Sequence, residues 1–214
     1  MARPAAERLS LKGFAAVLPG SRFDLIEQFL APEQAKALMQ RLLAELSWQQ
    51  HRVKLFGREI PAPRLSCWVG DAGADYRYSG VHYPPNRWTE ALLAARAELE
   101  QHCQQPFNSV LANWYRNGAD SMGWHSDDEA QLGPQPLIAS LSLGAERRFQ
   151  LRSRDQRWRC DLQLSHGSLL LMGGTAQRLS QHALPKLAKR AQACGPRLNL
   201  TFRQIVATQP SKPS

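Results

Sequence analysis

Hydrophobic residues recur with a helical period in the N-terminal half of the chain. Leu38, Leu42 and Leu46 are spaced four positions apart, which places them on one face of a helix. Pro32 suits a first helical position, so we expect this helix to begin there. A second helix is expected over residues 88–103, where Leu and Ala residues again recur along one face.

The pattern changes near residue 109, after which short apolar or alternating runs are separated by turn residues. Residues 51–60 already predict two short strands around a turn at Phe56 and Gly57. The later runs predict strands over residues 138–143, 148–152, 158–164, 168–172 and 197–206. Many short strands joined by turns are typical of an antiparallel sandwich or barrel. We therefore expect an α+β, mainly β fold in which N-terminal helices brace the β core.

The two ends of the chain show neither period. Residues 1–20 are expected to form an N-terminal arm and residues 208–214 a flexible tail, which leaves residues 21–207 as a single domain. The first residues lack the apolar core of a signal peptide, and no later run approaches the length of a membrane span. We therefore expect a cytoplasmic protein with no membrane partner.

Charge and cysteine content narrow the choice of partner and compartment. The chain of 214 residues carries 27 Lys and Arg against 18 Asp and Glu, a formal net charge of +9. This excess favours an anionic partner, usually a nucleic acid, although a generally basic soluble protein would show the same charge. The four cysteines form no CxxC pair, which favours free thiols in a reducing compartment.

A His-x-Asp pair provides the first candidate chemistry. Because His125 and Asp127 are two positions apart, extended backbone would place both side chains on one face. They would supply two corners of the two-His-one-carboxylate triad that binds non-haem Fe(II). A solvated loop or a buried core histidine would show the same pair. His182 is favoured as the third ligand over His166, because His166 is followed by a turn and an apolar run.

The last predicted strand alternates between polar and apolar residues. Its polar face carries Arg197, Asn199, Thr201 and Arg203, with no acid among them, and arginine pairs well with carboxylates. A solvated edge strand would alternate in the same way. The two arginines lie about 20 Å apart along an ideal strand, so both can reach one small dicarboxylate only if the strand coils.

Four short motifs follow one another along the chain. They are Asn113-x-Tyr115, His125-x-Asp127, His182 and Arg197-x-Asn199-x-x-x-Arg203. In this order they resemble the AlkB family of Fe(II)/2-oxoglutarate-dependent dioxygenases, and the duplex-DNA-acting branch is the most similar. The resemblance covers most of the chain, from about residue 55 to residue 205. It includes further blocks at residues 70–73, 78–80, 138–144 and 166–169.

The resemblance implies a double-stranded β-helix, or jelly roll, which agrees with the fold expected from the hydrophobic pattern. It also implies that the metal ligands, which are the catalytic residues, are His125, Asp127 and His182. The residues implied to bind 2-oxoglutarate are Asn113, Tyr115, Arg197, Asn199 and Arg203. The implied cofactors are Fe(II), 2-oxoglutarate as cosubstrate and O2.

The activity implied by the resemblance is oxidative demethylation of N-alkylated bases, chiefly 1-methyladenine and 3-methylcytosine in DNA. The reaction would consume O2 and 2-oxoglutarate, release formaldehyde, succinate and CO2, and repair DNA alkylation damage. The same chemistry on RNA or on a protein side chain is one alternative. A jelly-roll module that binds damaged nucleic acid without turnover is another. A monomer is expected.

The resemblance also indicates a substrate pocket. Tyr78 and His125 would stack on the flipped base, and Tyr76 and Glu129 would bond its edge, with Ser79 beside them. Tyr76 and Tyr78 share a face in an extended segment, but ordinary strand tyrosines would do the same. Glu129 would equally suit a solvated, charged turn.

Two further features would contact the nucleic acid outside the pocket. Residues 51–64 form a candidate DNA-contacting hairpin with Phe56 near its tip, where the family's duplex-acting branch wedges an apolar side chain into the stack. Packing of Phe56 on the protein body is the alternative. Arg148 belongs to an arginine-rich segment, residues 147–159, that would contact phosphates, a solvated hairpin being the alternative.

Overall fold

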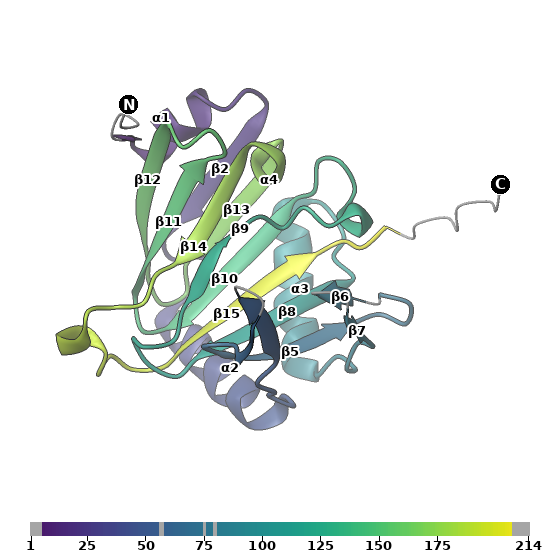
Figure 1. The fold of residues 1–214 in the computed structure, drawn as a ribbon. Coiled ribbons are helices and arrows are strands. Elements are labelled where there is room, and N and C mark those ends of the chain that lie inside the picture. The colour runs from purple at the N-terminus through teal and green to yellow at the C-terminus, as the bar shows by residue number, and fades with distance from the viewer. Residues whose placement is uncertain (1–5, 56–57, 75, 79–80, 207–214) are drawn as a thin grey trace.

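Two mainly antiparallel β-sheets pack against each other, and two long helices cover the outer face of the larger sheet (Figure 1). This computed structural model describes residues 6–55, 58–74, 76–78 and 81–206. The larger sheet has the strand order β2 (Ser21–Ile26), β13 (Leu169–Gly174), β10 (Ile138–Gly144), β15 (Arg197–Arg203), β8 (Ser109–Tyr115) and β5 (Leu65–Gly70). The smaller sheet has the order β1 (Glu7–Arg8), β12 (Trp158–Leu164), β11 (Arg147–Ser153), β14 (Ser180–Leu184) and β9 (Met122–His125). This is the expected jelly-roll core.

Two hairpins stand apart from these sheets. The first joins β3 (Arg52–Leu55) to β4 (Arg58–Pro61), as expected from residues 51–60. Its turn, residues 56–57, lies outside the described residues. The second joins β6 (Tyr76–Tyr78) to β7 (Val81–Tyr83).

The helices begin where their capping residues predict. Pro32 opens α2 (Pro32–Glu45), as expected, and the Gln34 side chain accepts a hydrogen bond from the Ala31 amide. Thr89 caps α3 (Glu90–Cys103) by accepting a hydrogen bond from the Leu92 amide, a contact of about 1 kcal/mol. Within the described residues, no helix combines the length and the hydrophobicity needed to cross a bilayer.

The alternation of β15 separates two environments. Leu198, Leu200 and Phe202 are fully buried in the core that the larger sheet shares with α2 and α3. Each of them contributes roughly 1.5–3 kcal/mol by this burial. The polar side chains point the other way, toward the smaller sheet. Because β15 pairs with both β10 and β8, it is a central strand, and the alternative of a solvated edge strand is wrong.

Residues 1–20 were expected to form an N-terminal arm, and the described part, residues 6–20, packs on the β core. Ser10 caps the short helix α1 (Leu11–Ala16), Phe14 is fully buried, and β1 pairs with β12. The reason is that this segment, although short, has an apolar face that covers one end of the sandwich. The last strand ends at Arg203 rather than at residue 206. The expected tail, residues 208–214, lies outside the described residues.

The described residues also form three one-turn helices: η1 (Ala130–Leu132), α4 (Ala176–Leu179) and η2 (Lys189–Ala191). Of these, α4 joins β13 to β14 and brings the buried side chain of Gln177 close to the end of β9. The helix that leads into β14 therefore lies next to the segment that follows β9.

Candidate metal and cosubstrate site

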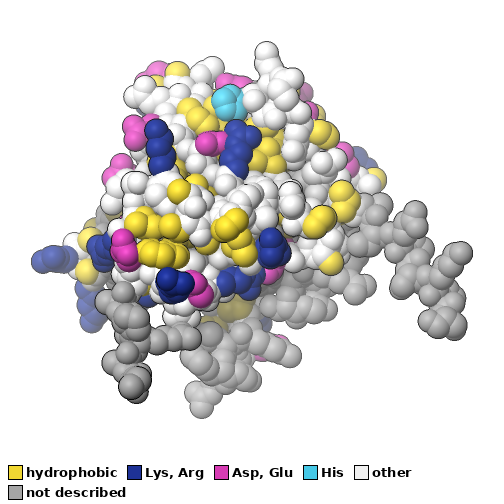
Figure 2. Space-filling view, turned by 90° about the horizontal axis from the view of Figure 1, so that it is seen from above, with side chains coloured by type: hydrophobic (Ala, Val, Ile, Leu, Met, Phe, Trp, Pro, Cys, Tyr) yellow, Lys and Arg dark blue, Asp and Glu magenta, His cyan; other side chains and the backbone are white. Residues whose placement is uncertain are grey.

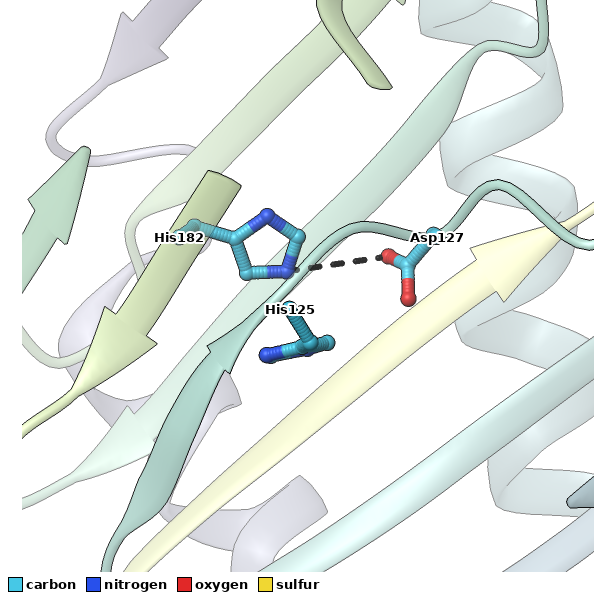
Figure 3. Close-up of side chains that lie close together, drawn as sticks. All are labelled: His125, Asp127 and His182. Atoms are coloured by element: carbon cyan, nitrogen blue, oxygen red, sulfur yellow. Dashed lines mark ion pairs between the residues drawn. The ribbon is translucent and has the colours of Figure 1, made fainter. Parts of the chain in front are cut away.

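His125, Asp127 and His182 converge in the space between the sheets (Figure 3). The two histidines face each other across the paired strands β9 and β14, and their ring centroids are 4.1 Å apart. Asp127 follows the end of β9, and its Oδ2 lies 3.9 Å from Nε2 of His182. One ligand atom from each residue lies within 4.8 Å of the others, which suits a single metal ion.

Hydrogen bonding fixes which nitrogen of His125 is available. Its Nδ1 lies 2.8 Å from the carbonyl oxygen of Gly123. Since a carbonyl can only accept, Nδ1 carries the proton and Nε2 keeps its lone pair. His125 is therefore held in the tautomer that a metal-binding imidazole requires.

The charges at this site also suit metal binding. Burial lowers the pKa of His182 to about 3, with a further contribution from His125, so its imidazole is neutral at physiological pH. Burial likewise lowers the pKa of His125. Burial alone would raise the pKa of Asp127, but Arg203 and the two histidines hold it below its ordinary value. Two neutral imidazoles and one carboxylate are the protonation states that ligate metals.

Arg203 is the direct partner of Asp127. Its Nη2 donates to Asp127 Oδ1 at 2.7 Å, and both side chains are almost fully buried. This contact leaves Oδ2 of Asp127 as the oxygen closest to His182. Arg203 thus neutralises the carboxylate and orients it.

A cavity of about 110 Å³ lies between the sheets, and the three converging side chains line it. Leu111, Phe149, Met172 and Leu184 form apolar parts of its wall. All eight residues implied to bind metal or 2-oxoglutarate line this cavity: Asn113, Tyr115, His125, Asp127, His182, Arg197, Asn199 and Arg203. The structure therefore brings together residues that are up to 90 positions apart.

Arg197 lies on β15, six residues before Arg203, and its side chain also lines the cavity. Its guanidinium lies over the Tyr115 ring, with Cζ 5.4 Å from the centroid, and Nη2 donates to Ser142 Oγ at 2.9 Å. Only 2% of Arg197 is exposed, its Nε has no hydrogen-bond partner, and it forms no ion pair with any acid among the described residues. Burial lowers its pKa to about 10, so it remains charged at neutral pH. A buried cation without an acid is suited to a carboxylate ligand.

Comparison with known proteins identifies the family. Residues 22–203 match the model of the 2OG-Fe(II) oxygenase superfamily. The chain is 40% identical over 166 residues to the mouse protein named DNA oxidative demethylase ALKBH2, covering 74% of this chain and 68% of the relative. The chain belongs to the AlkB family of these oxygenases. It is also 37% identical over 195 residues to mouse alpha-ketoglutarate-dependent dioxygenase alkB homolog 3, covering 86% of this chain.

The sequence match and the structural match cover different shares of the proteins compared. The chain spans 66% of the length of mouse alkB homolog 3. A solved structure titled "The structure of OsALKBH1" matches with a TM-score of 0.55 and 20% identity, over 85% of this chain and 97% of that one. At this identity the structural match supports the AlkB fold alone, and it agrees with the jelly roll described above.

The residues present fit the Fe(II) and 2-oxoglutarate that AlkB family membership implies. The donor set of two imidazoles and a carboxylate matches non-haem Fe(II). The buried Nε of Arg197, which has no hydrogen-bond partner, would suit one carboxylate of the cosubstrate. Asn199, in contrast, is occupied within the protein, because its Nδ2 donates to Ser140 Oγ and the Leu141 carbonyl while its Oδ1 accepts from Thr201.

Arg64 is a cavity residue that the sequence reasoning missed. It is buried on the segment leading into β5, and its Nε donates to Asn113 Oδ1 at 2.9 Å. This contact orients the amide of Asn113 toward the cavity that both residues line. The sequence pattern that could have predicted this position is the alternation of Arg64, Ser66 and Trp68, all of which line the cavity.

The structure describes only some of the side chains that were expected to bind substrate. Glu129 lines the same cavity as His125, Asp127 and His182. Tyr76 and Tyr78 lie on β6, but their side chains are outside the described part of the chain, as are Ser79 and Phe56. Arg148 is exposed on the outer face of β11, whereas its neighbour Phe149 points into the cavity.

Proposed function

We propose that this AlkB-family protein is an Fe(II)/2-oxoglutarate-dependent dioxygenase that oxidatively demethylates N-alkylated bases, thereby repairing alkylated nucleic acid. The observation that carries the proposal is the pairing of two features in one cavity. A complete His-Asp-His ligand set lies beside a buried arginine that has no acid partner. A binding module without turnover would need neither feature.

Each side chain has a separate task in the proposed reaction. His125, Asp127 and His182 would hold Fe(II), and Arg203 keeps the Asp127 carboxylate ionised and oriented. Bound together, Fe(II) and 2-oxoglutarate supply the oxidation of a substrate C–H bond by O2. Since Arg203 already pairs with Asp127, Arg197 is the arginine available for the distal carboxylate of 2-oxoglutarate, with Tyr115 beside it.

The apolar part of the cavity wall keeps water away from the reacting groups. Phe149 stacks on the His182 ring, with centroids 5.4 Å apart and an interplanar angle of 25°. Met172 and Leu184 add apolar surface to the wall of the same cavity. An apolar wall that excludes water strengthens the charge interactions of Arg197 and Arg203 with bound carboxylates.

The proposed substrates are 1-methyladenine and 3-methylcytosine. Methylation at these ring nitrogens leaves the base cationic near neutral pH, and Glu129 places a carboxylate at the cavity for such a base. Hydroxylation of the methyl group yields a hydroxymethyl adduct that loses formaldehyde and restores the base. The names of the two mouse relatives, a DNA oxidative demethylase and an alpha-ketoglutarate-dependent dioxygenase, support this reaction class.

The arginine-rich segment offers fewer phosphate contacts than its sequence suggested. Arg147 is buried, and Arg152 lies over the Trp124 ring, with Cζ 4.3 Å from the centroid. Of the exposed arginines, Arg154 pairs with Asp128 and Arg157 lies over the Trp158 ring. The proposed phosphate contacts are therefore Arg148 and Arg159, which are exposed on the outer face of the smaller sheet. On the face shown in Figure 2, basic side chains stand in separate groups, several of them next to acidic side chains.

Formaldehyde release from matched DNA and RNA oligonucleotides carrying 3-methylcytosine tests the proposal. The reaction contains Fe(II), 2-oxoglutarate and ascorbate, and His182→Ala is the control. Release by the wild type and not by the variant supports the proposed function, and the DNA-to-RNA ratio assigns the polymer. Consumption of 2-oxoglutarate without formaldehyde from either polymer would favour a protein side chain as substrate. Binding without any 2-oxoglutarate consumption would favour the non-catalytic module.

A further inference from the structure

The backbone around Asp127 is held differently from that of the two histidines. His125 and His182 lie on strands that pair with each other, whereas Asp127 lies two residues beyond the end of β9. The Asp127 amide donates instead to Oε1 of Gln177 at 2.9 Å. Gln177 comes from α4, is 3% exposed, and reaches Asp127 across 50 positions of sequence.

A second side chain holds the same segment from the outside. Arg154, in the turn between β11 and β12, donates from Nη2 to Ser126 Oγ at 3.0 Å and to the Asp128 carboxylate. The same nitrogen approaches the Gln177 carbonyl at 3.3 Å. The Arg154 guanidinium therefore bridges the residues on either side of Asp127 and the helix that carries Gln177.

We propose that Gln177 and Arg154 form a latch that positions the Asp127 carboxylate for metal binding. Both are positioning residues, because among the described residues neither side chain forms a hydrogen bond with His125 or His182. Gln177 fixes the Asp127 backbone from the buried side, and Arg154 fixes its two neighbours from the solvent side. The inference rests on the metal site proposed above.

The latch matters because metal sites tolerate little displacement. Ligand distances in a functional site fall within about 0.2 Å of their ideal values, so the backbone of a ligand that lies outside the paired strands needs other contacts to fix its position. Groups that orient metal ligands typically contribute about 10- to 100-fold in metal affinity. Oδ1 of Asp127 is already held by Arg203, so the latch sets the position of the backbone from which that side chain extends.

Mn(II) binding to the purified full chain, followed by calorimetric titration, tests the buried half of the latch. Gln177→Met removes the acceptor with little change in volume and is expected to weaken Mn(II) binding by about 10- to 100-fold. Thr175→Val is the matched control. It removes a partly buried 2.7 Å hydrogen bond to the Pro19 carbonyl from the residue that precedes α4, and it does not touch the segment of Asp127. Equal weakening by both variants would mean that α4 acts only through stability, and would overturn the latch.

The exposed half of the latch can be tested without risk to folding. Arg154→Ala removes the outer contacts, and Arg157→Ala removes the same charge from the same turn, where Arg157 lies over Trp158. Loss of a nearby positive charge alone would strengthen cation binding in both variants. Weaker Mn(II) binding in Arg154→Ala, with no weakening in Arg157→Ala, is therefore the expected result, and unchanged binding in both would refute the role of Arg154.

The wild-type titration separates failure of the site from failure of the latch. If the wild type binds Mn(II) and Gln177→Met and Arg154→Ala bind it equally well, the proposed metal site stands and the latch is wrong. If the wild type binds no Mn(II), the metal site and the latch are overturned together. Circular dichroism of each variant at the titration temperature establishes that folded protein is being compared.

Discussion

Arg203 and Asp127 form a buried ion pair 2.7 Å long, although 76 positions of sequence separate them. The pair joins the end of β15 to the segment after β9. It also gives the two arginines of β15 different surroundings, because Arg203 neutralises Asp127, the proposed metal ligand, while Arg197 has no acid partner among the described residues. The two arginines therefore need not both bind one small dicarboxylate, which their separation along β15 would make difficult.

Breaking this pair from one side is expected to destabilise the protein strongly. Arg203→Met would leave the Asp127 carboxylate buried and uncompensated, which costs about 3–5 kcal/mol in the free energy of unfolding. Adding Asp127→Asn should restore part of this loss, because the uncompensated charge is then absent. Urea unfolding of both single variants and the double variant measures the coupling. A double variant no more stable than Arg203→Met would show that Arg203 does not stabilise the protein through its ion pair with Asp127.

Replacing Arg197 should weaken 2-oxoglutarate binding and leave metal binding unchanged. Arg197→Met removes a charge-assisted contact worth about 1.5–3 kcal/mol, so the Kd for 2-oxoglutarate on the Mn(II)-loaded protein should rise about 10- to 100-fold. A 2-oxo acid without the distal carboxylate, such as 2-oxobutyrate, is the matched ligand. It should bind the wild type and the variant equally weakly. A comparable loss for both ligands would place Arg197 at the keto-acid end instead.

Asp120 gives the fold a defined sensitivity to acid. Burial would raise its pKa, but hydrogen bonds from the Arg116 amide, Nε and Nη2, at 2.8–2.9 Å, hold the pKa below the ordinary value of 3.8. A lowered folded-state pKa contributes stability above the unfolded-state value, and this is lost as the pH falls through the folded-state value. Asp120→Asn should therefore be less stable than the wild type near neutral pH, by about 1–3 kcal/mol.

The difference between the wild type and Asp120→Asn should narrow as the pH falls below 3.8. Guanidinium unfolding at a series of pH values measures it, and the subtraction removes the contributions of the other carboxylates. A difference that stays constant down to strong acid would show that the Asp120 charge has no part in stability.

The sequence was informative where local spacing decides the structure. The alternation of β15 placed Arg197, Asn199 and Arg203 on one face, and Pro32 marked the first residue of α2. Both patterns depend on residues within a few positions of one another. Short amphipathic segments carry less of this signal, which is why α1 and the burial of Phe14 were missed.

Contacts between distant segments could not be predicted in this way. Arg64 reaches Asn113 across 49 positions, and Gln177 reaches Asp127 across 50. Both contacts depend on which strands pair and in which register, which local patterns do not determine. The same holds for Asn199, for which the family resemblance implied a cosubstrate contact and whose amide bonds to β10, the neighbouring strand.

The choice between His182 and His166 leads to the last prediction. The structure places His182 with His125 and Asp127, whereas His166 lies at the far end of β10, where its Nδ1 accepts from the Gly144 amide at 2.8 Å. A ligand that binds only the folded state stabilises it by about 2.7 kcal/mol at 100 times its Kd. Mn(II) with 2-oxoglutarate should therefore raise the Tm of the wild type, and chelation by EDTA should reverse the rise. His166→Gln should start from a lower Tm but show the same rise, while His182→Gln should show little or none. A retained response in His182→Gln, with loss in His166→Gln, would reverse the assignment of the third ligand.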